Sequence, residues 1–169
     1  MDAAVWGMIG TLAGAVVGAA ASIGATWRAS TVSYRMHDDK QKQERIERAK
    51  EFQRTTLLDL QDALYDAVRM CGRAYYEDFV AYKSGTAWGK GRLTEELSAG
   101  LLASNRRVSI LIERIEHAEL RSEVKSLTAQ MSALTMQTEK EDADCMKIEM
   151  AQKFDVLVEK IGSVLRSYY

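Results

Sequence analysis

The sequence predicts an all-α protein, in which a single N-terminal transmembrane helix continues into an antiparallel cytoplasmic helical bundle of about four segments. The chain of 169 residues contains no proline and only eleven glycines, so it has few of the residues that break helices. Its apolar residues recur at spacings of three and four, which is typical of amphipathic helices. The expected organisation is an anchor over 1–27, a helical stalk over 28–45 and the bundle over 46–169.

The N-terminal segment has the length and the composition of a membrane span. Residues 3–27 contain no charged side chain, and a helix of that length, rising about 1.5 Å per residue, crosses a hydrocarbon core of about 30 Å. Trp6 and Trp27 lie near its ends and Arg28 follows, which predicts that these three residues anchor the helix at the membrane interfaces. A cleaved signal peptide and a buried soluble helix are the alternatives, although no basic residue precedes the run.

The distribution of basic residues around this segment predicts its orientation. No lysine or arginine precedes it, whereas Arg28, Arg35, Lys40 and Lys42 follow it closely. Because positive residues are retained in the cytoplasm, we expect the N-terminus outside and the C-terminal domain in the cytoplasm, at a cell inner membrane of the bacterial type.

Small side chains collect on one face of the predicted span. At about 100° per residue, the large apolar residues fall on the opposite face. Repeated glycines four residues apart let two helix backbones approach closely in lipid, so this face predicts a homo-oligomer formed through the span. The alternative is that a glycine-rich anchor carries this register by chance. The predicted association face consists of Gly7, Gly10, Gly14, Gly18 and Ser22.

The soluble part carries four apolar stripes separated by one clear loop, 84–91, and by two weaker breaks. Thr94 is a predicted N-cap, a change of phase near 116–119 predicts a kink or turn, and Thr138 with Glu141 matches a capping box. The four predicted stripes are Ile46, Ala49, Phe52, Leu57, Leu60, Leu64, Val68, Cys71, Tyr75, Phe79 and Tyr82; Leu97, Leu101, Ser104, Val108, Leu111, Ile115 and Ala118; Leu120, Val124, Leu127, Met131 and Leu134; and Ile148, Ala151, Phe154, Val158, Ile161, Leu165 and Tyr168.

The sequence offers no pattern of residues that would support catalysis or hold a cofactor or a metal ion. The two histidines, His37 and His117, lie apart, and the carboxylates beside His117 have the wrong spacing for a di-iron motif. The two cysteines form no pair typical of a metal site or a disulfide framework. The charged residues are interleaved and sum to a net charge of −1, so nucleic acid is not an expected partner. We therefore expect no enzyme.

One aromatic group remains open to two interpretations. Four of its residues precede the predicted loop and the fifth lies within it. Aromatic rings in such a place commonly pack across the end of a helical hairpin. The same rings could instead form a patch that binds a partner. The group consists of Tyr75, Tyr76, Phe79, Tyr82 and Trp88.

These observations together predict a membrane-anchored, self-associating helical scaffold or adaptor, whose cytoplasmic bundle is presented to a protein partner of unknown identity. The alternative is an oligomeric pore-forming or membrane-perturbing effector, of the holin or defence type. This alternative rests on Thr11, Ser22 and Thr26, whose hydroxyl groups lie beside the small face and could line a narrow pore.

Overall fold

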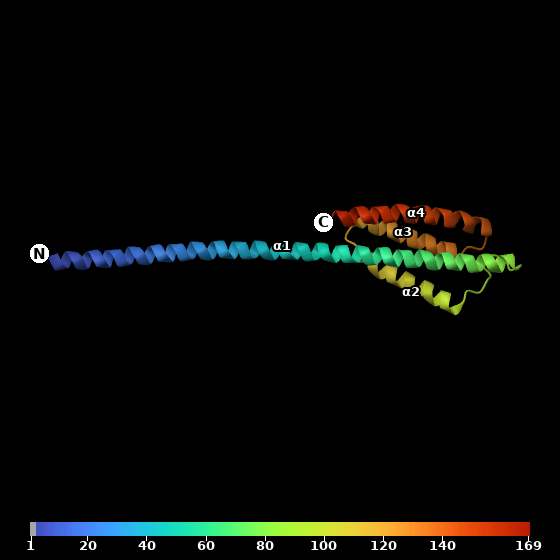
Figure 1. Cartoon of the computed structure of the whole chain (residues 1–169), viewed down its shortest axis with the longest axis horizontal. Helices are drawn as coiled ribbons and strands as arrows, with labels where there is room; N and C mark the ends of the chain where they lie inside the picture. Colours follow the sequence, from blue (N-terminus) through green and yellow to red (C-terminus); the bar gives the residue numbers. More distant parts are fainter. Residues whose placement is uncertain (1–2) are drawn as a thin grey trace. The chain divides into compact units, whose positions relative to one another are not determined.

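The computed structural model describes the backbone of residues 3–169 and the side chains of residues 18, 22, 27 and 36–169. Over that backbone the regular secondary structure consists of helices alone, without a strand, which confirms the predicted all-α class (Figure 1). The four helices are α1 (Ala3–Lys83), α2 (Glu95–Ile112), α3 (Ala118–Thr135) and α4 (Lys140–Arg166).

The chain divides into two compact units, Met1–Arg48 and Ala49–Tyr169, and α1 contributes to both. In the first unit, the side chains from residue 36 to residue 48 are all exposed. A helix with a polar surface all round is stabilised by pairs of side chains four residues apart. Such pairs among residues 36–48 include His37 with Gln41 at 3.1 Å, Asp38 with Lys42 at 2.6 Å, Gln43 with Glu47 at 3.2 Å and Glu44 with Arg48 at 3.3 Å.

Most of the predicted membrane segment lies outside the described side chains, including Trp6, Gly7, Gly10, Gly14 and Arg28. Within the residues that the structure describes, no helix combines the length and the apolar character needed to cross a membrane. The transmembrane anchor therefore stays a prediction.

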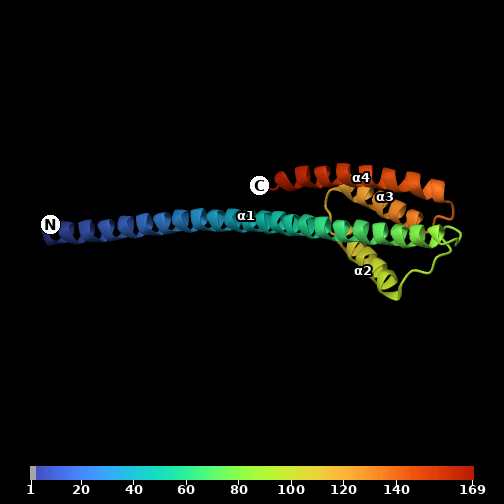
Figure 2. The same cartoon turned by 45° about the vertical axis from the view of Figure 1, so that its right-hand side comes forward.

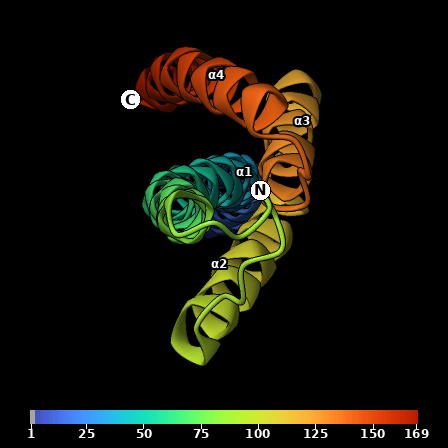
Figure 3. The same ribbon diagram turned by 90° about the vertical axis from the view of Figure 1, so that its right-hand side faces the viewer.

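In the second unit, residues 49–83 of α1 pack against all three other helices. Consecutive helices of this unit run in opposite directions (Figures 1 and 2). Viewed along the bundle, α3 lies beside both α2 and α4, and α1 occupies the concave side of these three helices (Figure 3). The Cys71 thiol on α1 donates a hydrogen bond to the Met131 carbonyl on α3 at 3.6 Å, and Tyr65 packs edge-on against Phe154 of α4 at 4.9 Å between ring centroids.

The predicted stripes match the buried core best in the middle of the bundle. All five residues of the third stripe, from Leu120 to Leu134, are buried, and so is most of the second. The first stripe was predicted to start too early, because Ile46 and Phe52 are half exposed and the buried apolar face of α1 begins at Leu57.

The fourth stripe starts in the wrong phase. The exposed fraction of Ile148 is 60%, and Ala151 is also exposed. The buried residues of α4 are instead Ala143, Met150, Phe154, Leu157 and Ile161, at helical spacings of seven, four, three and four. These residues lie on the side of the helix that faces α3 and α1, whereas Ile148 lies off that side.

Two helix N-termini are capped by side chains. The Thr94 hydroxyl accepts a hydrogen bond from the backbone N–H of Leu97 at 3.4 Å, which confirms Thr94 as the N-cap of α2. The predicted break near 116–119 is the connection 113–117, and at its end Nδ1 of His117 accepts from the N–H of Leu120 at 3.3 Å. His117 is therefore the N-cap of α3.

The capping box predicted at Thr138 and Glu141 is wrong. The N-cap of α4 is Glu139, and its side chain makes no capping hydrogen bond. The N–H of Thr138 is bonded instead to the side chain of Gln137 at 3.1 Å, so Thr138 belongs to the turn that precedes the helix. Glu141 and Asp142 still place negative charge in the first turn of α4, where the helix dipole favours it.

A single buried amide fastens the α2–α3 connection to α1. The Nε2 group of Gln53 donates to the Arg114 carbonyl at 3.0 Å, and its Oε1 accepts from the N–H of Glu116 at 3.1 Å. The side chain of Gln53 is 8% exposed, so water cannot readily replace either bond.

We predict that Gln53→Leu lowers the free energy of unfolding by about 2 kcal/mol, because it leaves a carbonyl and an N–H group of the connection unpaired beside an apolar side chain. Denaturant unfolding of the full chain in mild detergent, followed by circular dichroism, measures this change. The control is Gln152→Ala on the exposed side of α4, which should change stability by less than about 0.5 kcal/mol. Equal stability of the two variants would contradict the role of Gln53.

Candidate functional site

The candidate site lies at the hairpin end of the second unit, where α1 ends and the loop 84–94 begins. Trp88 in this loop folds back on α1, and its exposed fraction is only 5%. Its ring packs edge-on against Tyr75 and Tyr82, with ring centroids 5.2 and 6.0 Å apart. Edge-to-face aromatic pairs at these separations are stabilising beyond the area that they bury. Trp88 thus fixes the loop to the end of α1.

Two glycines allow the loop to turn back so that Trp88 packs on the end of α1. Gly85 has a φ of 95° and Gly89 a φ of 69°, both in the region that L side chains rarely adopt. A Cβ atom at Gly89 would lie 2.5 Å from the Gln137 carbonyl oxygen in the α3–α4 connection, whereas a Cβ atom at Gly85 would meet nothing within 4 Å. Gly89 is therefore needed for close approach as well as for backbone conformation.

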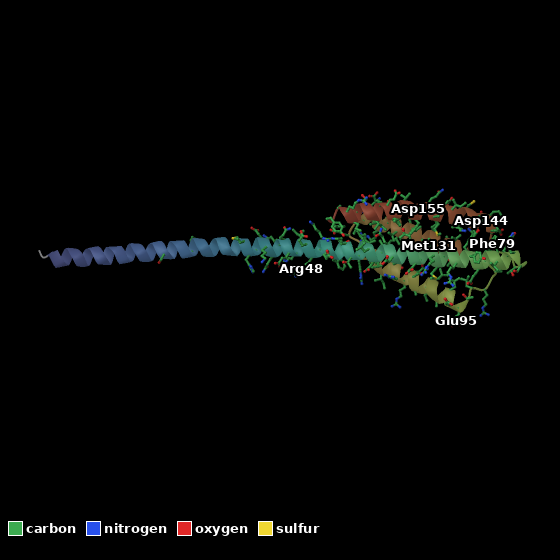
Figure 4. All side chains as sticks on the ribbon, viewed as in Figure 1. Arg48, Phe79, Glu95, Met131, Asp144 and Asp155 are labelled. Atoms are coloured by element: carbon green, nitrogen blue, oxygen red, sulfur yellow. The ribbon has the colours of Figure 1, made fainter. Side chains whose placement is uncertain are left out.

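Polar groups from α4 surround the exposed side of this aromatic cluster. The Tyr75 hydroxyl donates a hydrogen bond to the Asp144 carboxylate, which also pairs with the Lys140 ammonium at 2.5 Å. The ammonium of Lys147 lies 4.1 Å from the centroid of the Tyr75 ring, within the range of a cation–π interaction. Figure 4 shows Phe79 and Asp144 at the same end of the bundle.

These contacts shift the acidity of the groups involved. Burial, together with the hydrogen bond to Asp144, raises the pKa of the Tyr75 phenol from 10.0 to about 12. The hydrogen bonds from Lys140 and Tyr75 lower the pKa of the Asp144 carboxyl, and the bond to Asp144 raises the pKa of Lys140. At neutral pH the Tyr75 hydroxyl is therefore a donor, and the Asp144 carboxylate and the Lys140 ammonium are charged.

A shallow cavity of about 340 Å³ opens beside the cluster. It is lined by Gly72, Tyr75, Tyr76, Phe79 and Lys147. A Cβ atom at Gly72 would meet nothing within 4 Å, and the side chain of Tyr76 is 64% exposed. Aromatic rings around one ammonium group can accommodate an apolar or aromatic side chain that carries an adjacent negative charge.

The structure separates the five aromatic residues of the predicted patch. Trp88 belongs to the hydrophobic core, and Tyr75 and Phe79 are packed against it while remaining partly exposed. Tyr76 and Tyr82 are exposed. Packing of the hairpin end therefore explains Trp88, whereas the aromatic residues that line the cavity all come from α1.

Of the residues predicted for the span, the structure describes the side chains of three. Gly18 and Ser22 are exposed, and a Cβ atom at Gly18 would meet nothing within 4 Å. The ring of Trp27 is 75% exposed.

The residues of α4 at this site were not predicted from the sequence. Asp144 and Lys147 have their partner, Tyr75 on α1, about seventy residues away, and Lys140 joins the site only through Asp144, so no local pattern indicates these contacts. The one available signal was the place of Tyr75 in the apolar stripe of α1, since a phenol that packs against a core usually finds a hydrogen-bond partner.

The other reactive groups of the second unit are its potential metal ligands and its two cysteines. Among the residues that the structure describes, no group of three or more His, Cys, Asp or Glu side chains is arranged to hold a metal ion. Burial raises the pKa of the Cys71 thiol to about 11, and Cys145 is exposed on α4.

Comparison of the chain with protein-family models, with curated proteins and with solved structures finds no match.

We predict that Gly89→Ala destabilises the hairpin end by about 3 kcal/mol, because it combines a strained backbone with overlap against the Gln137 carbonyl. Gly85→Ala is the matched control: it has the same backbone problem without the overlap, and should cost about 1 kcal/mol. Thermal unfolding of both variants measures the difference. If both lost the same stability, the close approach at Gly89 would be unimportant.

Proposed function

We propose that the protein is a membrane-anchored, self-associating helical scaffold or adaptor, which presents its bundle to a protein partner in the cytoplasm. The observation that carries this proposal is the uncharged segment 3–27, which is long enough to span a bilayer as a helix. The backbone of this segment belongs to α1, so all its interior peptide groups can be bonded within the helix, as lipid requires.

The residues at the end of the segment support an anchor with the proposed orientation. Trp27 is exposed, and an indole ring in this position suits the interface between lipid and water. Basic residues follow the segment and none precedes it, which favours a cytoplasmic bundle.

The register of small residues supports self-association of the anchor. Gly10, Gly14 and Gly18 repeat at four-residue spacing, and the open space at Gly18 would let a second backbone approach closely. Anchored copies diffuse in two dimensions, which raises their effective concentration, so that weak contacts suffice for assembly.

The aromatic cavity at the hairpin end supports the adaptor role. Tyr76 and Phe79 supply apolar contact area, and Lys147 supplies a positive charge beside them. Exposed aromatic residues around a small cavity are frequent anchors in protein interfaces. We propose that the partner inserts an apolar side chain flanked by an acidic one.

We predict that the full chain stays with the membrane fraction on alkaline carbonate extraction, because residues 3–27 expose no charge to lipid. A C-terminal alkaline phosphatase fusion, which is active only outside the cytoplasm, should be inactive, whereas a C-terminal fluorescent protein should fluoresce. Release of the chain by carbonate, or an active phosphatase fusion, would reject the anchor or its orientation, respectively.

We predict that Gly14→Ile and Gly18→Ile each reduce association of the span at least tenfold, because a branched side chain there would hold two backbones apart. Ala20→Ile, off the centre of that face, adds a similar volume and should keep most of the association. A transmembrane-association reporter fused to residues 1–28 measures all three variants. The glycine register would be incidental if the three behaved alike.

The second candidate function is an oligomeric pore. It is favoured by Thr11, Ser22 and Thr26, of which the described Ser22 is exposed. An assembled span with hydroxyl groups turned inward could pass ions, whereas an adaptor would not. Potassium leakage from vesicles that contain the full chain distinguishes the two functions.

A further inference from the structure

Helix α2 has two apolar faces, and the bundle uses one of them. Leu97, Ser104, Val108, Leu111 and Ile112 are buried against the other helices. On the opposite face, successive exposed residues again have helical spacing, and two of them are large: Leu102 is 74% exposed and Ile110 is 48% exposed. This outer face of α2 consists of Glu95, Ala99, Leu102, Ala103, Arg106 and Ile110.

The outer face lies on the side of α2 that is turned away from the hydrophobic core, and it is not an edge of the buried face. Tyr65 of α1, although exposed, still contacts a neighbouring helix, since it packs on Phe154. Leu102 and Ile110 instead lie about 140° from the centre of the buried face of α2, on either side of the helix face opposite to it, at about 100° per residue. In the view along the bundle, no other helix covers that side of α2 (Figure 3).

A cavity of about 840 Å³ adjoins the first half of this face. It is bounded by the loop residues 92–94 and by α2 from Glu95 to Leu102. The small side chain of Ala99 leaves space between the loop and Leu102. The surface therefore offers a large protruding side chain next to a hollow.

The charges of the outer face are complementary to those of the same face in a second helix that runs antiparallel to the first. Glu95, Ala99, Leu102 and Arg106 have spacings of four, three and four. A two-fold axis between residues 100 and 101 exchanges Glu95 with Arg106 and Ala99 with Leu102. Neither Glu95 nor Arg106 forms an ion pair in the described part of the chain, and a separation of roughly 16 Å along the helix keeps them apart from each other.

We propose that the outer face of α2 binds the outer face of α2 in a second copy of this chain, with the two helices antiparallel. Each Leu102 then sits over Ala99 of the other copy, beside the cavity. Each Glu95 pairs with Arg106 of the other copy, and each Ile110 reaches the loop end of the opposite cavity. A self-complementary patch of this kind forms a closed two-fold contact, in which exposed charge pairs set the register more than the affinity.

Charge reversal tests the register in the full chain. One copy carries Ala99→Cys and the other Leu102→Cys, both with Cys145→Ser to remove the exposed native thiol, and tags of different size identify the mixed pair. Disulfide formation between the copies reports the contact. Glu95→Arg in both copies, or Arg106→Glu in both copies, should lower the yield about fivefold, since two attractive pairs worth roughly 0.5 kcal/mol each are lost.

The decisive sample combines Glu95→Arg in one copy with Arg106→Glu in the other, which recreates both pairs and should restore the yield. The control is Glu149→Arg in both copies, an exposed residue of α4 that lies away from α2, which should leave the yield unchanged. Association through the span raises all yields without favouring the mixed sample, so the pattern reports α2 alone. Equal yields for the separate and the combined reversals would overturn the proposal.

Discussion

The second unit depends on the burial of one face of α1, from Leu57 to Ala74, because α2, α3 and α4 are all held against it. That face alternates large and small side chains: Leu60 and Leu64 project between the neighbouring helices, whereas Ala63, Ala67 and Cys71 leave room for them. Interiors pack at crystal-like density, so the small residues are as necessary as the large ones. Helix α3 and this face of α1 lie between α2 and α4 (Figure 3).

The sequence predicts best those helices whose large apolar residues all lie on one face. The stripe of α3 is buried along its whole length because α3 has neighbours on both sides and few other apolar residues. In α4, Ile148 and Val156 are as apolar as the residues that are buried, so periodicity alone could not select the correct face. The packing of α4 on α1 and α3 makes that choice, and no local pattern contains it.

Polar contacts between distant residues were the least predictable part. Gln53 binds a connection about sixty residues away, and at the hairpin end Tyr75 binds Asp144, which is 69 residues away in the sequence. A glutamine in a helix usually signals an exposed face, so only its position between the apolar residues of α1 could have suggested burial. At the hairpin end, the choice between core packing and a binding patch depended on the depth of Trp88, which follows from the two glycine conformations of the loop. Of these two glycines, Gly89 also lies close to the α3–α4 connection, where a side chain would overlap the Gln137 carbonyl.

The two cysteines give the folded chain a built-in contrast between thiols. Cys145 meets solvent, while Cys71 is enclosed between α1 and α3 and its thiol is held protonated by burial. Thiolates are the reactive species, so an alkylating reagent should label Cys145 at once and Cys71 only when the bundle opens. The labelling rate of Cys71 therefore measures how often α1 and α3 separate, on the unaltered protein and in any membrane environment. For the same reason an oxidant can join two chains through Cys145 without disturbing the core.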